Sequence, residues 1–264
     1  MSREIDDVLK SALSQKNVLY RVLIPDVYEQ GERRYPVLYL LHGLFGTFEN
    51  WTELTNLGRY IQNLPLIVVM PDGGDGWYTD TTAGEANERY LIEELIPAVD
   101  GAFRTIPDRN SRAIAGNSMG GYGAFKFALK YPSFFCLAGS FSGAFHAPKL
   151  SGPAQNSNWE ELGPSISRVF GAAESSIRSE NDLKQIVNGL GKMQIEALPY
   201  FYFECATQDG FLPVNRELDE AFTAAGILHE YHEIDGGHDW AYWDGRIRSF
   251  LDLAAEKLKI SGAE

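Results

Sequence analysis

The chain has 264 residues, a formal net charge of −13 at pH 7, and 44% hydrophobic and 12% aromatic residues. A chain of this size and composition can bury a large core, which excludes an intrinsically disordered protein. Because its charge has the same sign as nucleic acid and anionic lipid, neither partner is expected.

The first sixteen residues, MSREIDDVLKSALSQK, lack the basic head, the apolar stretch and the cleavage site of a signal peptide. No window of the sequence approaches the roughly 20 apolar residues of a membrane span. We therefore expect a cytoplasmic protein that does not associate with membranes. Cys136 and Cys205 lie in apolar runs, so we expect buried thiols rather than a disulfide.

Short β-rich runs alternate with helical stretches along the chain. Strands are predicted at 17–25, 35–43, 64–73, 111–118, 135–143, 200–207 and 229–235. Helices are predicted at 49–63, 85–101, 119–130, 181–194, 214–225 and 239–258. Several strands are continuously apolar, as parallel strands covered on both faces should be. The alternation predicts an α/β fold with a mostly parallel, doubly wound central sheet and helices on both faces.

Residues 144–199 interrupt this alternation. They contain several prolines and glycines and the polar run SGPAQNSNWEE, and they are too few and too polar for a separate domain. We interpret them as a small insertion or partial lid within a single domain that spans residues 1–264.

The segment Gly116-Asn117-Ser118-Met119-Gly120 matches the pattern G-x-S-x-G, with a predicted strand before it and a predicted helix after it. A sharp turn from strand to helix lifts a serine hydroxyl clear of the sheet, and glycines must flank it where backbones approach closely. Ser118 is therefore the candidate nucleophile. The alternatives are a glycine-rich turn that happens to hold a serine, and a phosphate-binding loop, for which the lysine and glycine signals are missing.

A nucleophilic serine needs a general base, which in this layout follows it in the chain, at the end of a later strand. His238 follows the last predicted strand and two glycines, and it precedes the last predicted helix. Of the other histidines, His42 precedes the serine and His146 begins the insertion. His229 and His232 lie within a strand. His238 is the candidate base, with a helix cap or a solvent-exposed histidine as the alternative interpretation.

The loop after the strand at 200–207 holds the candidate acid, Asp209. Such an acid fixes the tautomer of the imidazole and stabilises the imidazolium. Asp235 and Glu204 are weaker candidates, since Asp235 shares the histidine's loop and Glu204 lies inside a strand.

The negative charge of a tetrahedral intermediate requires backbone N–H donors. One is expected from Met119, the residue after the serine, and another from the loop HGLFG, where Leu44 is the candidate. An ordinary turn between strand and helix would also explain the glycines of that loop.

The loop at residues 72–76, with sequence DGGDG, looks like part of a calcium-binding loop. The calcium-binding repeat G-G-x-G-x-D would need an acidic residue at the position of Tyr78, so this loop does not complete it. No metal and no cofactor is expected. Trp77 and Tyr78 are candidate substrate-binding residues at the mouth of the pocket, or aromatic residues that pack the loop. The aromatic cluster at 240–243 is interpreted as core, with a substrate wall as the second interpretation.

Together, these segments of the sequence resemble a known family. LYRVLIPDVY, YPVLYLLHGLFGTFENW, WYTD, GNSMGGYGAF, TQDG and GGHDWAYW occur in the order seen in the esterase D-like putative esterases, and the likeness runs from about residue 10 to 250. That family includes tributyrin esterases, S-formylglutathione hydrolases, feruloyl and acetyl xylan esterases, and mycolyltransferases. The resemblance implies an α/β-hydrolase fold, a triad of Ser118, Asp209 and His238, and oxyanion donors at Leu44 and Met119.

The resemblance also narrows the expected activity. S-formylglutathione hydrolases usually read HGLTCT where this chain reads HGLFGT, so a tributyrin or feruloyl-type serine carboxylesterase is more similar. A thioesterase or an acyltransferase of the same family is the alternative, and a non-enzymatic binding module is a distant third.

The insertion at 144–199 is mostly polar between 150 and 161, which predicts a shallow acyl site that prefers acetyl to butyryl esters and tolerates feruloyl groups. The expected substrate is a small-molecule or carbohydrate-linked ester, and a homo-oligomer is compatible with the sequence.

Overall fold

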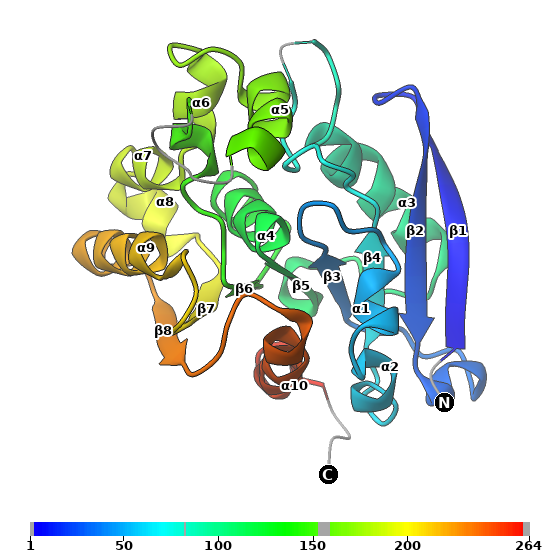
Figure 1. The fold of residues 1–264 in the computed structure, drawn as a ribbon. Coiled ribbons are helices and arrows are strands. Elements are labelled where there is room, and N and C mark those ends of the chain that lie inside the picture. Colours follow the sequence, from blue (N-terminus) through cyan, green and yellow to red (C-terminus); the bar gives the residue numbers. More distant parts are fainter. Residues whose placement is uncertain (1–2, 82, 153–158, 261–264) are drawn as a thin grey trace.

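The computed structural model describes residues 3–81, 83–152 and 159–260 (Figure 1). Its strands are β1 (Arg3–Ser11), β2 (Lys16–Ile24), β3 (Val37–Leu41), β4 (Ile67–Pro71), β5 (Arg112–Asn117), β6 (Leu137–Phe141), β7 (Tyr200–Ala206) and β8 (His229–Ile234). Its α-helices are α1 (Asn50–Glu53), α2 (Leu57–Tyr60), α3 (Ile96–Ala102), α4 (Met119–Lys130), α5 (Trp159–Phe170), α6 (Ser176–Asn181), α7 (Leu183–Asn188), α8 (Lys192–Glu196), α9 (Leu212–Ala225) and α10 (Trp240–Lys257). Four short helical turns are η1 (Asp26–Glu29), η2 (Tyr90–Leu95), η3 (Arg109–Ser111) and η4 (Ala147–Lys149).

The eight strands form one sheet in the order β1-β2-β4-β3-β5-β6-β7-β8. β1 and β2 form an antiparallel hairpin, β2 pairs antiparallel with β4, and the strands from β4 to β8 pair in parallel. Because parallel strands end at the same edge, the loops that follow β3, β5, β7 and β8 open on one side of the sheet. These are the loops that carry the candidate site residues.

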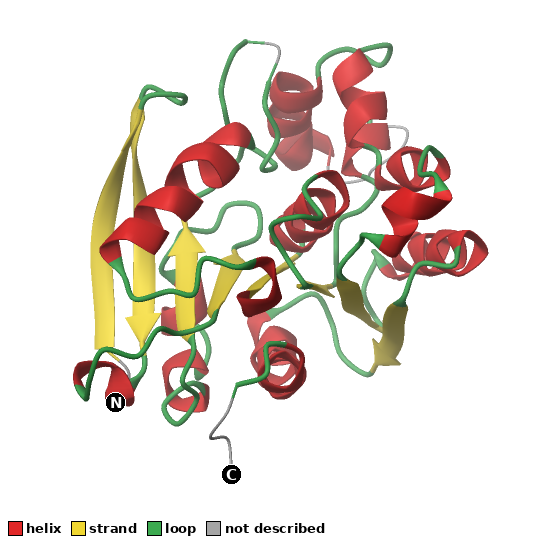
Figure 2. Ribbon diagram, turned by 180° about the vertical axis from the view of Figure 1, so that it is seen from behind, coloured by secondary structure: helices red, strands yellow, loops and turns green. Residues whose placement is uncertain are grey.

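Helices cover both faces of the sheet (Figure 2). Tyr39 and Leu41 of β3 pack in the same buried cluster as side chains of α4 and α9. Leu38 and Leu40 point to the other face and pack in a second cluster with side chains of α1, α2 and α10. This alternation follows from the two-residue period of a strand, and it explains why β3 is apolar at every position.

All seven predicted strands are present close to their predicted bounds, so the predicted fold class agrees with the structure. The strand β1 was not predicted, because five of the nine residues in its sequence, REIDDVLKS, are charged. It forms nevertheless, since it pairs with β2 along its whole length, from Arg3 opposite Ile24 to Ser11 opposite Lys16.

The segment between β6 and β7 is more helical than the sequence indicated. It contains η4 and α5 to α8, of which α5 and α6 were not predicted. Figure 1 shows these helices (green to yellow) grouped beside α9, and α7 packs against α9. Much of the polar run predicted at 151–161 lies outside the described residues.

Both cysteines are free thiols: Cys205 is buried and Cys136 is half-buried. Among the helices that the structure describes, none combines the length and the apolar character needed to traverse a bilayer.

Candidate active site

Ser118 occupies a strained turn between β5 and α4. Its φ of 52° and ψ of −117° lie in a region that residues other than glycine seldom adopt. A Cβ on Gly120 would lie 2.4 Å from the carbonyl oxygen of Leu41, and one on Gly116 would lie 2.5 Å from the carbonyl carbon of Gly120. The close approach of these backbones therefore requires both glycines, and the turn leaves the serine at the carboxyl end of β5.

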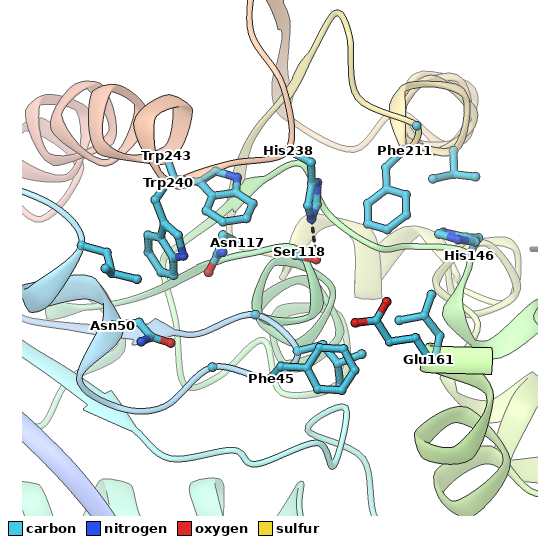
Figure 3. A pocket seen from close by; sticks show the side chains of 17 residues that line it. Phe45, Asn50, Asn117, Ser118, His146, Glu161, Phe211, His238, Trp240 and Trp243 are labelled. Carbon is cyan, nitrogen blue, oxygen red and sulfur yellow. Dashed lines mark hydrogen bonds between the residues drawn. The ribbon is translucent and has the colours of Figure 1, made fainter. Parts of the chain in front are cut away.

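Three side chains from separate loops form a hydrogen-bonded row, of which Figure 3 shows the contact between Ser118 and His238. Ser118 Oγ lies 3.0 Å from Nε2 of His238, and Nδ1 of His238 lies 2.6 Å from Oδ2 of Asp209. An ionised carboxylate can only accept a hydrogen bond, so Nδ1 of His238 must donate to Asp209 and carries the imidazole proton. Nε2 then accepts a hydrogen bond from the serine hydroxyl. The structure thus brings together the three residues that the sequence singled out.

The Asp209 carboxylate lies just beyond β7 and is only 7% exposed. Its other oxygen, Oδ1, accepts a hydrogen bond of 2.8 Å from the Phe211 N–H. Burial alone would raise the pKa of Asp209, but the hydrogen bond and the charge of His238 hold this pKa below the ordinary value. The carboxylate is therefore anionic at neutral pH and can orient the imidazole.

Two aromatic rings hold the imidazole of His238 between them. Phe211, just before α9, packs edge-on against it with ring centroids 4.8 Å apart. Trp243 of α10 does the same from the other side at 4.9 Å, as Figure 3 shows. The loop between β8 and α10 ends at Asp239, whose side chain caps α10 by accepting from the Tyr242 N–H. Packing and the helix cap together position His238.

The loop after β3 lies against the candidate nucleophile. A Cβ on Gly43 would be 3.4 Å from Cβ of Ser118, so the backbone leading into Leu44 runs close to the serine. Neither the Leu44 N–H nor the Met119 N–H donates a backbone hydrogen bond within the described residues. Both N–H groups therefore remain candidate donors to an oxyanion.

His42 ties this loop to the loop after β4. Its Nε2 accepts a hydrogen bond of 2.8 Å from the Gly73 N–H, so its proton lies on Nδ1, which donates to the Gly43 carbonyl oxygen at 2.7 Å. The Tyr78 hydroxyl donates to the His42 carbonyl oxygen at 3.1 Å. His42, which is 1% exposed, therefore fixes the loop after β3 against the loop after β4.

A cavity of about 780 Å³ opens in front of Ser118. One side of it is formed by Trp240 and Trp243 of α10, and the other by Phe211 and Glu161 (Figure 3). The complete lining is Gly43, Leu44, Phe45, Gly46, Asn50, Leu54, Asn117, Ser118, His146, Glu161, Leu162, Gly210, Phe211, Val214, His238, Trp240 and Trp243. The tryptophans at 240 and 243 thus form a wall of the cavity, which was the second interpretation of that cluster.

Trp77 and Tyr78 require a correction, because they do not line this cavity. They are 3% and 0% exposed, and the Trp77 ring donates to Ser165 Oγ at 3.1 Å. Both residues have positive φ values, 50° and 48°, which turn the loop so that the rings point back into the core. They pack the loop, as the alternative interpretation had it.

The weaker acid candidates lie away from His238. Asp235 accepts a hydrogen bond of 3.1 Å from the Gln208 side chain. Glu204 is fully buried within β7 and accepts from the Tyr202 hydroxyl at 2.7 Å.

The residues of the cavity wall that sequence reasoning missed include His146, Glu161 and Phe211. His146 and Glu161 come from the irregular segment between β6 and β7, where the sequence has no clear period. Phe211 could have been found, since it follows Asp209 by two residues and so had to lie near the acid.

The loop at residues 72–76 uses its carboxylates to hold backbone. Asp72 accepts from the Gly74 N–H at 2.8 Å, and Asp75 accepts from the Phe45 N–H at 3.1 Å. Within residues 3–81, 83–152 and 159–260, no three His, Cys, Asp or Glu side chains gather in a way that could hold a metal ion.

A model of the family described as "Putative esterase" matches residues 11–251. An esterase of Mycobacterium tuberculosis is 35% identical in an alignment of 239 residues that covers 82% of this chain and 51% of that protein. An acetyl esterase of Caldicellulosiruptor saccharolyticus is 32% identical in an alignment of 220 residues that covers 81% of each chain. The chain spans about half the length of the mycobacterial relative.

Solved structures are similar over nearly the whole chain. A ferulic acid esterase superposes with a TM-score of 0.84 at 28% identity, covering 97% of this chain and 98% of its own. FphF, a fluorophosphonate-binding serine hydrolase of Staphylococcus aureus, superposes with a TM-score of 0.85 at 25% identity, covering 96% and 98%. The predicted α/β-hydrolase fold is confirmed by this likeness.

Proposed function

Because this chain belongs to the putative esterase family, we propose that it is a serine carboxylesterase in which Ser118, His238 and Asp209 form the catalytic triad. The observation that carries the proposal is the row of two hydrogen bonds from Ser118 through His238 to the buried Asp209. Such a row activates a serine hydroxyl, which is a weak nucleophile by itself.

In the proposed reaction, Ser118 Oγ attacks the carbonyl carbon of the ester while Nε2 of His238 takes its proton. The negative charge moves to the carbonyl oxygen, where the N–H groups of Leu44 and Met119 stabilise it. The imidazolium then protonates the leaving alcohol, and an acyl group remains on Ser118. Water, deprotonated by His238, attacks this acyl-enzyme and releases the carboxylic acid.

We propose short-chain acyl and aryl esters as substrates, of small molecules or carbohydrates. The similar proteins include an acetyl esterase and a ferulic acid esterase, whose acyl groups differ in size. The cavity, at about 780 Å³, mixes apolar side chains such as Leu162 and Phe211 with polar ones such as Asn50, Asn117, His146 and Glu161, so its wall is not continuously apolar. A long acyl chain would therefore gain little of the roughly 0.8 kcal/mol that each buried methylene contributes.

The test is hydrolysis of p-nitrophenyl acetate, butyrate, octanoate and dodecanoate, and of methyl ferulate, by the wild type and Ser118→Ala. We expect the highest kcat/KM for acetate or butyrate, and a loss of about 10⁴- to 10⁶-fold in kcat on removal of the serine hydroxyl. Circular dichroism of the variant checks that the fold is intact. An optimum at octanoate or longer contradicts the substrate class, and a well-folded Ser118→Ala with a tenth or more of the activity contradicts the triad.

A further inference from the structure

The cavity in front of Ser118 has an unbalanced charge. Among the described residues that line it there is no lysine, arginine or aspartate, and Glu161 is the one glutamate. The pKa of His146 is lowered to about 4 by burial and by the nearby Lys149, so this imidazole is neutral at pH 7. Apart from the proposed catalytic base, the wall therefore carries a single formal charge, and it is negative.

The helix α5 determines where this carboxylate lies. Glu161, Ser165 and Arg168 follow at intervals of four and three residues, so they share one face of the helix. Ser165 accepts a hydrogen bond from the Trp77 ring, and Arg168 forms an ion pair with Glu85 and donates to the Asp75 carbonyl oxygen at 2.9 Å. The contacts of Ser165 and Arg168 thus hold this face of α5 against the loop after β4. Glu161 lies on the same face, at the end that reaches the cavity.

No cation neutralises Glu161 within the part of the chain that the structure describes. Arg168 is seven residues along α5, or about 10 Å of helix rise, and its guanidinium already has partners. The residue lies in the first turn of α5, where the helix dipole favours a negative charge. Figure 3 shows the Glu161 side chain directed into the pocket that holds Ser118.

We propose that Glu161 is a specificity-determining residue that makes the pocket select against anionic esters and in favour of cationic ones. This inference rests on the proposed esterase function. A second carboxylate in the cavity would face Glu161 without a compensating lysine or arginine, whereas an ammonium group would be attracted. At separations of about 6–8 Å in a partly hydrated site, one unit charge changes kcat/KM about three- to tenfold, and salt weakens the effect.

Two matched substrate pairs test the inference. On the acyl side, mono-p-nitrophenyl succinate carries a carboxylate that p-nitrophenyl butyrate lacks. On the alcohol side, acetylcholine carries a quaternary nitrogen where 3,3-dimethylbutyl acetate has a carbon. The quantity measured is the ratio of kcat/KM within each pair, so a general change in activity cancels.

The variants are Glu161→Gln, which removes the charge at nearly constant shape, and Glu161→Lys, which reverses it. Glu160→Gln is the control, because Glu160 lies in the same helical turn and is exposed but does not line the cavity. A general loss of negative charge or of helix-end stabilisation would affect both positions equally.

In Glu161→Gln we expect kcat/KM for the succinate ester, relative to the butyrate ester, to rise about three- to tenfold, or kcat/KM for acetylcholine, relative to 3,3-dimethylbutyl acetate, to fall by the same factor. In Glu161→Lys the change should be larger in the same direction. Glu160→Gln should match the wild type, and 0.5 M NaCl should reduce the difference. A change below twofold in both pairs, or an equal change in Glu160→Gln, overturns the inference. If the wild type hydrolyses neither neutral ester, the proposed function itself fails.

Discussion

The carboxylate of Asp209 meets two donors at once: the His238 imidazole on Oδ2 and the Phe211 N–H on Oδ1. Replacing it by asparagine keeps the shape but places an amide N–H toward the imidazole in one of its two orientations. We expect Asp209→Asn to lower kcat for p-nitrophenyl butyrate by about 10³- to 10⁴-fold, because the wrong tautomer is favoured. Asp235→Asn is the control and should retain most activity. Equal losses in the two variants would contradict the assignment of Asp209.

The carboxylates at residues 72–76 lead to a second prediction about single residues. Asp72 and Asp75 accept hydrogen bonds from the backbone of Gly74 and Phe45, so they already have partners. We expect prolonged dialysis against EDTA to leave kcat/KM and the melting temperature unchanged, since the proposed chemistry uses only side chains and backbone N–H groups. Loss of activity that calcium or zinc restores would contradict this.

For single residues, the sequence predicted which side chains meet at the end of the sheet better than it predicted the lining of the cavity. Ser118, Asp209 and His238 each follow a strand, and the ends of parallel strands meet at one edge, so their proximity could be inferred. The positions of Trp77 and Tyr78 could not, because positive φ values at both residues rotate the side chains inward. Nothing in the types of these residues indicates such a backbone.

The turn between β5 and α4 makes a prediction about elements. Gly120→Ala would place a Cβ 2.4 Å from the Leu41 carbonyl oxygen, so strand and helix would have to move apart. We expect a loss of about 1–3 kcal/mol in the free energy of unfolding, or more, and a drop of about 2–4 °C in melting temperature per kcal/mol. Thermal unfolding followed by circular dichroism measures it.

Gly245→Ala is the matched control for that prediction. Gly245 lies inside α10, and a Cβ there meets nothing within 4 Å. The same substitution should stabilise the helix by about 0.5–1 kcal/mol, because glycine loses more backbone entropy on folding than alanine. If both variants shifted the melting temperature in the same direction, the contact at Gly120 would not be the cause.

Among the elements, those with a strong period were predictable and those that depend on a partner were not. The helix predicted at 119–130 has the bounds of α4, and β7 and β8 lie within a residue of the predictions. By contrast, β1 is a charged segment that becomes a strand by pairing with β2, and α5 packs on a loop far away in sequence. Local propensity contains no information about such partners.

A buried acid makes the stability of the whole molecule depend on pH. Glu204 in β7 is fully buried, its Oε1 has no hydrogen-bond partner among the described residues, and Arg246 lies 3.6 Å from it. Burial raises the pKa of Glu204 to about 7 from 4.5. The folded protein holds this proton more tightly than the unfolded chain does. The stability that the protonated Glu204 contributes is therefore fully present below pH 4.5 and is lost as the pH rises through 7.

We therefore expect Glu204→Gln to reduce the fall in the free energy of unfolding between about pH 5 and 8, by at most about 3 kcal/mol. Urea unfolding at intervals of one pH unit measures the two profiles. Glu196→Gln, an exposed position on α8, serves as the control and should reproduce the wild-type profile. Parallel profiles for the wild type and Glu204→Gln would show that Glu204 does not titrate in this range.

The two rings that hold His238 have a consequence for conformational entropy. Phe211 immediately precedes α9 and Trp243 lies in α10, and each contacts the imidazole edge-on. A side chain packed on both sides gives up its rotamer freedom when the protein folds. In the proposed mechanism His238 must meet both the serine and the leaving group in one orientation. Because its side chain is already ordered by folding, no further rotamer entropy is lost at each turnover. The ordering of His238 is thus built into the fold by one residue just before α9 and one residue of α10, and in the proposed mechanism it precedes any encounter with substrate.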